Sequence, residues 1–529
     1  MKPIICRRIA ARKHRLDQRL DKFNFPADLS QPMIRGGKVH FDLAGRAVAT
    51  PYGGLALMQH LVGDLGLAEA IDQRLHLFKL HLPYHESDHV LNLAYNALCA
   101  GTCLEDLELR RQDEAYLNLL GAQRIPDPTT AGDFCRRFKP DDLVALQQAY
   151  DVARQKVWSQ QPPAFFAEAR IDADGVLVET DAECKQGVDY SYKGVWGYHP
   201  LVLTLANTSE VLRLINRSGN RPSHEGAAAL FDECIELCRA AGFRRIRLRG
   251  DTDFSQTKHL DRWHQQEDVR FVFGLDVTAD HHVDIDDLPA SVWKPLKRPP
   301  KYEAQGKPRA RPERIKQQIV QQRKFKDIRL VSEEVAEMPY RPVACKTTYR
   351  LVIVRKNLIV SDPQQERLFD DYRYFLYITN DWESTQSEIV FSANDRCQQE
   401  NVLAQLAALR ALHAPVDNLL SNEAYMLITA LAWNLKAWLA LSLPETALEK
   451  PAKKQGKKRN SSKQNQNRQP SEKHRLLGME FRTFVNYFLR IPAQVITTGR
   501  RIVVRLLAYN RWQPLFFRLA ESFTRPSRC

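Results

Sequence analysis

The spacing of apolar residues changes along the chain and divides it into segments of different predicted structure. Between residues 46 and 160, apolar residues recur at helical spacing, as in "GGLALMQHLVGDLGLAEAIDQRL" and "DDLVALQQAYDVARQKVW". This period predicts a run of amphipathic helices. Residues 1–45 show little periodicity and form a basic N-terminal arm. The proline-containing stretch "SQQPPAFF" ends the helical pattern, so we place a domain boundary near residue 160.

After this boundary the period becomes two, which is typical of strands. Residues 161–280 begin with three consecutive strand patterns, "ARIDADGVLVET", "HPLVLTLANT" and "EVLRLINRSG". A helix pattern, the strand "RIRLRG", a second helix and the strand "RFVFGLDV" follow. Three hairpin-like strands and then two β-α-β crossovers predict an α/β fold, in which helices pack on a mixed sheet.

The remaining chain alternates between structured and strongly basic segments. Residues 281–370 indicate a β-rich insertion, because strand-like stretches flank the basic run "KPLKRPPKYEAQGKPRARPERIKQQIVQQRKFK". In residues 371–445 the strand pattern resumes, a helix begins near Asn394, and a largely buried helix follows. Residues 446–475 are basic and low in complexity, so we expect a disordered linker. Residues 476–529 are basic again, and we expect them to be helical.

The charge balance narrows the class of partner. The chain has 77 Lys+Arg against 63 Asp+Glu, a net charge of +14. An excess of this kind favours nucleic acid or an anionic membrane as partner. The N-terminus lacks the apolar core of a signal peptide, and the most apolar stretch is interrupted by Asn434 and Lys436. Because the charge clusters at both ends and in the insertion, we expect a cytoplasmic nucleic-acid-binding protein with no membrane contact.

Several carboxylates stand where strands end, and they suggest a metal centre. Asp172 and Asp174 share one face of the first strand, and Asp251 ends the fourth. Glu400 lies in the first turns of the predicted helix after the insertion. Clustered carboxylates repel each other unless a cation lies between them, and hard oxygen ligands suit Mg²⁺. The alternative is an ordinary surface strand followed by an Asp-rich turn, in which Asp251 and Asp253 face solvent.

Motifs spread over most of the chain carry a family resemblance. They are "RIDADG", "KGVWGYHPL", "RSGNRPSHEG", "RLRGDTDF", "FVFGL", "YITND", "RCQQEN" and "SNEAYMLITALAWNL", with "DPTTAGDFCRRF" upstream and "RRIVVRLLAYNRWQPLFFRL" downstream. In this order and spacing the chain resembles the DDE transposases of bacterial insertion sequences, which have a ribonuclease-H-like core. Within them it is most similar to insertion-sequence group thirteen-eighty.

The resemblance implies roles for particular acids. It places the first catalytic aspartate at Asp172, the second at Asp251 and the glutamate at Glu400, all three as metal ligands. Asp174 and Asp253 are the alternative acids. Two Mg²⁺ ions are implied, with Mn²⁺ as a substitute, and a pair about 4 Å apart activates the attacking oxygen and stabilises the leaving one. The chain departs from the family pattern at Asp253, where a small residue is usual, and at Ala404, where a basic residue is usual.

Basic and aromatic residues near these acids and in the basic segments are candidates for DNA contact. Arg249 either meets phosphates or coats the strand in solvent, and Arg396 either contacts phosphate, orients Glu400 or forms a surface pair. Tyr198 and Lys193 either stack on a distorted base or belong to a packed hairpin. The full set of candidates is Lys193, Tyr198, Arg249, Lys297, Arg298, Arg309, Arg311, Arg396, Lys457, Lys458 and Arg459.

These expectations combine into one leading function. The chain is expected to bind the inverted-repeat ends of an insertion sequence, with residues 46–160 contacting the ends, and to catalyse Mg²⁺-dependent DNA cleavage and strand transfer. The implied partners are double-stranded DNA, both element ends and target, and a second copy in a synaptic homodimer associated with the bacterial nucleoid. The alternatives are a ribonuclease-H-like nuclease or resolvase without strand transfer, and a transposase-derived DNA-binding repressor.

Overall fold

The computed structural model describes residues 2–21, 40–41, 45, 48–80, 83–298, 327–361, 372–443, 471–498 and 501–524. Arg309, Arg311, Lys457, Lys458 and Arg459, which the sequence singled out for DNA contact, lie outside the described residues. So does most of the predicted linker.

The N-terminal third is helical, as its apolar spacing predicted. Gly66 separates the helices Leu55–Leu65 and Leu67–Asp72. It has a left-handed conformation with φ 66°, which glycine adopts without steric cost. The basic arm also contains a helix, α1 (Pro3–Leu20), that its weak periodicity did not predict. The other helices are α2 (Leu55–Leu65), α3 (Leu67–Asp72), α4 (Glu86–Leu98), α5 (Asp106–Arg111), α6 (Glu114–Leu120), α7 (Pro128–Arg136) and α8 (Pro140–Trp158).

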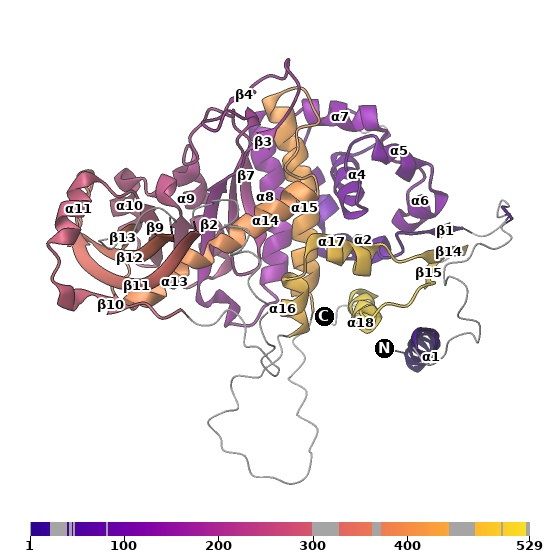
Figure 1. Ribbon diagram of the computed structural model, residues 1–529. Helices are drawn as coiled ribbons and strands as arrows, with labels where there is room; N and C mark the ends of the chain where they lie inside the picture. The colour runs from indigo at the N-terminus through magenta and orange to yellow at the C-terminus, as the bar shows by residue number, and fades with distance from the viewer. Residues whose placement is uncertain are drawn as a thin grey trace, which may run out of the picture.

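A mixed nine-stranded sheet extends from the middle of the molecule to one end, the left in Figure 1, and the N-terminal helices lie on the other side. Its strand order is β10-β11-β12-β13-β9-β8-β2-β6-β7. Neighbours β2, β8 and β9 run parallel, whereas β6 and β7 form antiparallel hairpin pairs beside β2. The bounds of this part of the sheet are β2 (Ala169–Gly175), β6 (Leu201–Leu205), β7 (Glu210–Ile215), β8 (Ile246–Gly250) and β9 (Val269–Leu275). The predicted order of three strands followed by two crossovers is therefore confirmed.

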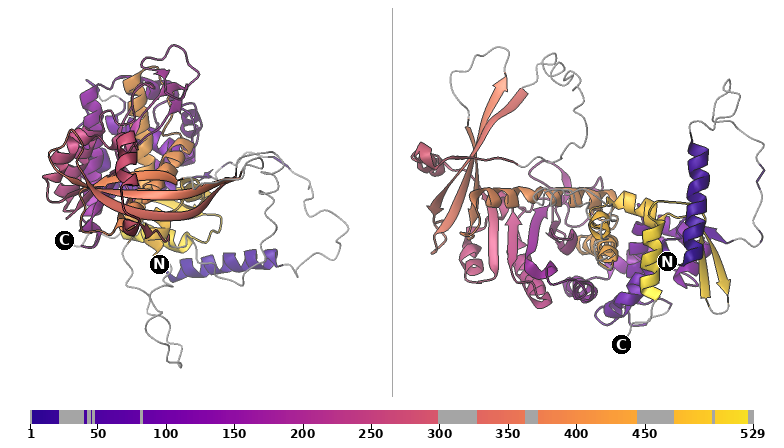
Figure 2. Two further views of the ribbon diagram at one scale, coloured as in Figure 1. Left: turned by 60° about the vertical axis from the view of Figure 1, so that its left-hand side comes forward. Right: turned by 90° about the horizontal axis from the view of Figure 1, so that it is seen from below.

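The β-rich insertion extends the same sheet instead of forming a separate one. Strand β13 pairs antiparallel with β9, and β12, β11 and β10 follow outward (Figure 2). The bounds are β10 (Lys294–Pro295), β11 (Asp327–Tyr340), β12 (Tyr349–Ser361) and β13 (Tyr372–Thr379). Helix α11 (Ala279–Asp286) stands between β9 and β10 in the chain, and a small sheet of β3 (Val178–Glu179), β5 (Trp196–Tyr198) and β4 (Asp189–Tyr190) follows β2.

One helix of the core, α15, joins the helical N-terminal third to the sheet. Helix α15 is long and apolar enough to cross a membrane, but its apolar window is entirely buried within the protein. It packs against α4, α7 and α8 of the N-terminal third and against β7 of the sheet. Asn434 bonds both backbone groups of Val211, and Lys436 donates to the carbonyl of Leu477. The core helices are α9 (Ala227–Ala241), α10 (Leu260–His264), α13 (Gln386–Asp395), α14 (Cys397–Ala408) and α15 (Leu419–Leu441).

The C-terminal region is not wholly helical. It contains the hairpin of β14 and β15, to which the short N-terminal strand β1 adds a third strand. The β-branched residues of "AQVITT" and "RIVVRL" favour this strand conformation over the expected helix. The bounds are β1 (Ala49–Thr50), α16 (Glu472–Leu477), α17 (Phe481–Phe484), β14 (Ala493–Thr498), β15 (Arg501–Leu506) and α18 (Gln513–Thr524).

Candidate active site

Two carboxylates from neighbouring parallel strands face one guanidinium. Asp172 is paired in register with Arg249, so two residues further on Asp174, on β2, is level with Asp251, which directly follows β8. Nη1 of Arg396 donates to Oδ2 of Asp174 at 3.2 Å. Nη2 of Arg396 lies 3.8 Å from Oδ2 of Asp251. The carboxyl ends of β2 and β8 thus bring two acids to one cation, which comes from the junction of α13 and α14.

The electrostatics of this pair show how strongly it needs positive charge. Burial raises the pKa of Asp174 to about 6, although Arg396 opposes the shift. The pKa of Asp251 is also raised, mainly by burial and further by the neighbouring charge of Asp253. Burial is the main cause of both shifts, so ionising the two carboxylates together is costly at this site and would be easier with a further cation nearby.

Asp172 lies in a different environment from Asp174. Its side chain is 1% exposed, and Arg249 donates to both of its oxygens, at 2.6 and 2.8 Å. Arg249 also donates to the carbonyl of Ser392 and to Asp395. The bidentate pair occupies both oxygens of Asp172. Asp172, the acid favoured from the sequence, is therefore not one of the two acids that contact Arg396.

The third expected acid, Glu400, lies one helical turn after Arg396. Nε2 of Gln399 donates to the carbonyls of Asp172, at 3.1 Å, and Val202, at 3.0 Å, which fixes the first turn of α14 on strands β2 and β6. Residues four apart share a helix face, so Glu400 is on the same face as Arg396. Its side chain is exposed. Across the part of the chain that the structure describes, no three His, Cys, Asp or Glu side chains are close enough together to form a complete metal site.

The donors present nevertheless fit a divalent cation of the Mg²⁺ type. Asp174 and Asp251 offer carboxylate oxygens to a place where a positive group, the guanidinium of Arg396, already lies. Hard oxygen donors are the ligands that Mg²⁺ prefers. Asp174 and Asp251 would hold the ion. Asp253 is exposed, and its backbone N–H donates to Oδ1 of Asp251 at 3.1 Å, so it orients Asp251 through the backbone.

One pair of residues behind Asp174 was not identified from the sequence. A Cβ built on Gly175 would lie 2.6 Å from Nε2 of His199. The imidazole is buried, and its Nδ1 lies 2.8 Å from the carbonyl of Arg221. Gly175 is therefore required by close approach, and His199 supports the strand end that presents Asp174. The sequence signal was only the glycine directly after the acid.

The candidate DNA-contacting residues fall into distinct environments. Arg249 is buried against Asp172, and its burial argues against phosphate contact. Tyr198 is fully buried and donates to the carbonyl of Gln186 at 2.8 Å, which is the packed-hairpin alternative. Lys193 is exposed, with its ammonium over the ring of Tyr192.

Two candidates from the start of the insertion remain at the surface. Arg298 forms a bidentate ion pair with Glu333, at 2.6 and 2.8 Å, so its charge is already partnered. Lys297 is exposed. Of the DNA-contact candidates described, Arg396 is therefore the one that touches the carboxylate pair.

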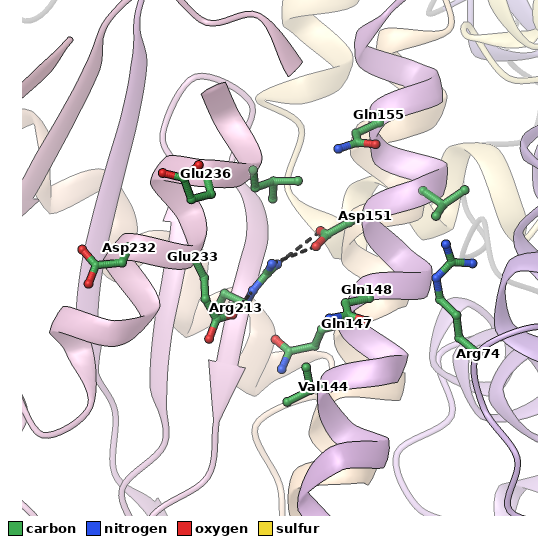
Figure 3. A pocket seen from close by; sticks show the side chains of 12 residues that line it. Arg74, Val144, Gln147, Gln148, Asp151, Gln155, Arg213, Asp232, Glu233 and Glu236 are labelled. Atoms are coloured by element: carbon green, nitrogen blue, oxygen red, sulfur yellow. Dashed lines mark hydrogen bonds and ion pairs between the residues drawn. The ribbon is translucent and has the colours of Figure 1, made fainter. Parts of the chain in front are cut away.

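A cavity of about 750 Å³ lies elsewhere, between α8 and α9 (Figure 3). Arg213 lies at its wall and bonds Asp151 on one side and Glu233 on the other, both at 2.8 Å. Neither Asp174 nor Asp251 lines this cavity. Its charged groups form an ion-pair network that joins the two helices, so we assign it a structural role.

Residues 31–455 match the family described as Transposase DDE domain group 1. A cryo-EM structure of the piggyBac transposase synaptic complex with hairpin DNA is similar at 12% sequence identity and a TM-score of 0.32, over 73% of this chain and 77% of that chain. No curated protein matches the chain. Because the family match covers most of its length, the chain belongs to the DDE transposases of group 1, metal-dependent enzymes of phosphoryl transfer.

Proposed function

We propose that this transposase binds the inverted-repeat ends of an insertion sequence and catalyses DNA cleavage and strand transfer at a centre formed by Asp174, Asp251 and Glu400. The observation that carries the proposal is the shared contact of Asp174 and Asp251 with Arg396. In this proposal Asp174 takes the role expected for Asp172 from the family resemblance, because Asp172 already has both oxygens bonded to Arg249.

The position of each acid supports this assignment. Asp174 and Asp251 lie at the carboxyl ends of adjacent parallel strands, where substrate sites of α/β sheets form. Asp172 lies one inward-facing position further back, where Arg249 bonds both of its oxygens and is itself bonded to Ser392 and Asp395 of α13. An ion bound at the strand ends is open to a phosphate, whereas one at Asp172 would have to displace a buried guanidinium.

The residues of the chain divide the work between them. A divalent ion, when bound, would supply charge neutralisation at phosphorus and activation of the attacking oxygen. Asp174 and Asp251 would hold that ion, and Glu400 would add a donor from the helix. Gln399 bonds the first turn of α14 to β2, the strand that carries Asp174, and so fixes the start of the helix that carries Glu400. Arg396 is the cation nearest to the acids, and it orients them and offers a donor to the phosphate.

The wider assignment rests on the motifs quoted above. We propose membership of insertion-sequence group thirteen-eighty, a synaptic homodimer, action on element ends and target DNA, and a location at the bacterial nucleoid. A nuclease or resolvase would share the carboxylates but not join ends. A repressor derived from a transposase would not need Asp174 and Asp251 to face one cation, so this pair speaks against it.

An end-joining assay tests the proposal. Purified full-length protein is incubated with a labelled duplex that carries the element end, a target plasmid, and Mg²⁺ or Mn²⁺. We expect nicking that leaves a 3′-hydroxyl and joining of that end to the plasmid, and we expect neither product with Asp251→Asn. Nicking without joining would favour the nuclease alternative. Tight end binding with no nicking in either metal would favour the repressor.

A further inference from the structure

Helix α1 is a basic helix that lies outside the core. None of its residues is buried. It lies beside α18 and the β14–β15 hairpin, at the opposite end of the molecule from the long strands β11 and β12 (Figures 1 and 2). A helix of 18 residues without a buried side chain gains little from packing, so its sequence must be explained by something other than stability.

One face of α1 turns toward the protein. Ile5, Ile9 and Arg12 are partly covered, and Leu16, 39% exposed, continues this line at helical spacing. Nη1 of Arg12 donates to the carbonyl of Leu506, at the end of β15, at 2.9 Å. This contact orients the helix, so its other faces point away from the protein.

The outward faces carry unpaired positive charge. Arg7, Arg8, Arg15 and Arg19 are exposed, and none forms an ion pair with the residues that the structure describes. Lys13 is paired with Asp17 at 2.8 Å. The neighbouring hairpin and the chain after it add further exposed arginines, Arg501, Arg505 and Arg511. Like charges placed this close destabilise a free helix, which favours an anionic partner.

We propose that α1, with the adjacent β14–β15 hairpin, binds duplex DNA at a surface separate from the catalytic carboxylates. This inference rests on the proposed function for the presence of DNA. The major groove of B-form DNA is about 12 Å wide and admits one α-helix. Arginines on the exposed faces of such a helix reach phosphates on both sides of the groove.

A second copy of the chain is the rival partner for α1. The cavity between α8 and α9 presents three acids from α9, Asp232, Glu233 and Glu236, which could meet a basic helix (Figure 3). Each acid already has an arginine: Arg262, Arg213 and Arg239 respectively. A basic helix from another copy would have to compete with these ion pairs, whereas DNA phosphates hold only mobile counterions, whose release favours binding.

Matched arginine pairs test the inference. Full-length protein is titrated with labelled duplex DNA in EDTA, so metal-dependent cleavage does not contribute. Arg7→Gln with Arg8→Gln should reduce the slope of log affinity against log salt by about 2 and weaken binding about tenfold at moderate salt. The control is Arg244→Gln with Arg245→Gln, an exposed adjacent pair before β8, at the strand ends remote from Asp251. We expect the control to leave affinity and slope unchanged.

The exposed thiol of Cys6 gives a second measurement that needs no substitution. Duplex DNA should slow alkylation of Cys6 by iodoacetamide at least about fivefold, as read by peptide mass spectrometry. Unchanged affinity and salt slope in the Arg7/Arg8 variant, or unchanged Cys6 alkylation, would overturn the inference. If the Arg7/Arg8 substitutions change the sedimentation of the DNA-free protein but not its affinity for DNA, α1 docks on a second copy of the chain. That result would also overturn the inference.

The two proposals fail separately. Suppose the wild-type protein does not nick DNA in Mg²⁺ or Mn²⁺, but the Arg7/Arg8 variant binds duplex DNA more weakly than the wild type does. The catalytic assignment then fails and the role of α1 stands. If nicking is normal and both arginine pairs behave alike, the role of α1 fails and the catalytic assignment stands.

Discussion

Nη1 of Arg396 lies 3.2 Å from Oδ2 of Asp174, although 222 residues separate them in the chain. The same guanidinium lies 3.8 Å from Asp251. One arginine at a helix junction therefore joins the first and fourth strands of the core at their carboxyl ends. This relationship is the basis of our proposal that the reactive region lies at Asp174 and Asp251.

Asp174→Asn should abolish metal-dependent nicking while DNA binding in EDTA persists. The substitution removes a charge that holds the ion but keeps the size of the side chain. We expect the rate to fall about 10³-fold or more, at least as much as the loss of one preorganised electrostatic contact. A gel assay with a labelled end duplex measures both properties. The matched control is Asp253→Asn, an exposed neighbour of Asp251, which should keep a measurable rate. A dead Asp253→Asn with an active Asp174→Asn would contradict the assignment.

Asp172→Ala should act on folding. Arg249 would remain in the core, its side chain 1% exposed, without its bidentate partner. Breaking a buried pair from one side costs about 3–5 kcal/mol of unfolding free energy. Urea denaturation followed by circular dichroism measures this loss. Asp172→Ala combined with Arg249→Met should recover most of the stability, because no unpaired charge is left. If the single variant is as stable as the wild type, the pair does not have the structural role described above.

Gly175→Ala should impair catalysis through His199. The added Cβ would meet Nε2 of His199 at 2.6 Å, and the imidazole is held by its contact with the carbonyl of Arg221. A displacement of about 1 Å in a catalytic group costs on the order of 10²-fold in rate, so we expect a loss of about 10- to 100-fold in nicking. Gly175→Ala with His199→Ala should restore part of the rate, because the obstacle is removed. No recovery in a folded double variant would show that the glycine serves another purpose.

Glu423→Gln should change how stability depends on pH. Burial raises the pKa of Glu423 to about 7, and the backbone N–H of Asn216 donates to its side chain at 2.9 Å. A folded pKa above the unfolded value means that its contribution to stability is full below about pH 4.5 and is lost as the pH rises through 7. Glutamine keeps an oxygen for Asn216 and has no charge to bury.

We therefore expect the variant to gain stability over the wild type as the pH rises from 5 to 8, by on the order of 3 kcal/mol. Urea denaturation at several pH values measures the difference. A constant difference between the two proteins across this range would show that Glu423 does not titrate there.

Periodicity alone was enough to predict much of the fold and one acid of the candidate site. The order of β2, β6, β7, β8, β9 and the helices between them follows from apolar spacing, whereas the small sheet of β3, β4 and β5 does not. Asp251 became a candidate because it directly follows a strand. The choice between Asp172 and Asp174 could not be made in this way, because residues two apart share one face of a strand. What separates them is a buried arginine from another strand, Arg249, whose partner depends on register.

Other differences also arise from contacts between distant segments. Apolar spacing predicted strands in the insertion, but not that they join the central sheet. They join it because β13, more than ninety residues after β9, pairs with both β12 and β9. The C-terminal hairpin is completed by β1 from the N-terminal region, a pairing that local sequence does not encode. Apolar spacing did not predict helix α1, because its line of apolar residues is short and is interrupted by Arg12.

The buried helix α15 has a consequence for any attempt to divide this protein. One continuous set of buried side chains includes Leu61 and Leu146 of the helical N-terminal third and Leu203 of the sheet, and α15 lies within it. A fragment cut near residue 160 would leave an apolar helix of 23 residues without its cover on one side. Such fragments should aggregate, and the intact chain should melt in a single cooperative transition that includes both halves.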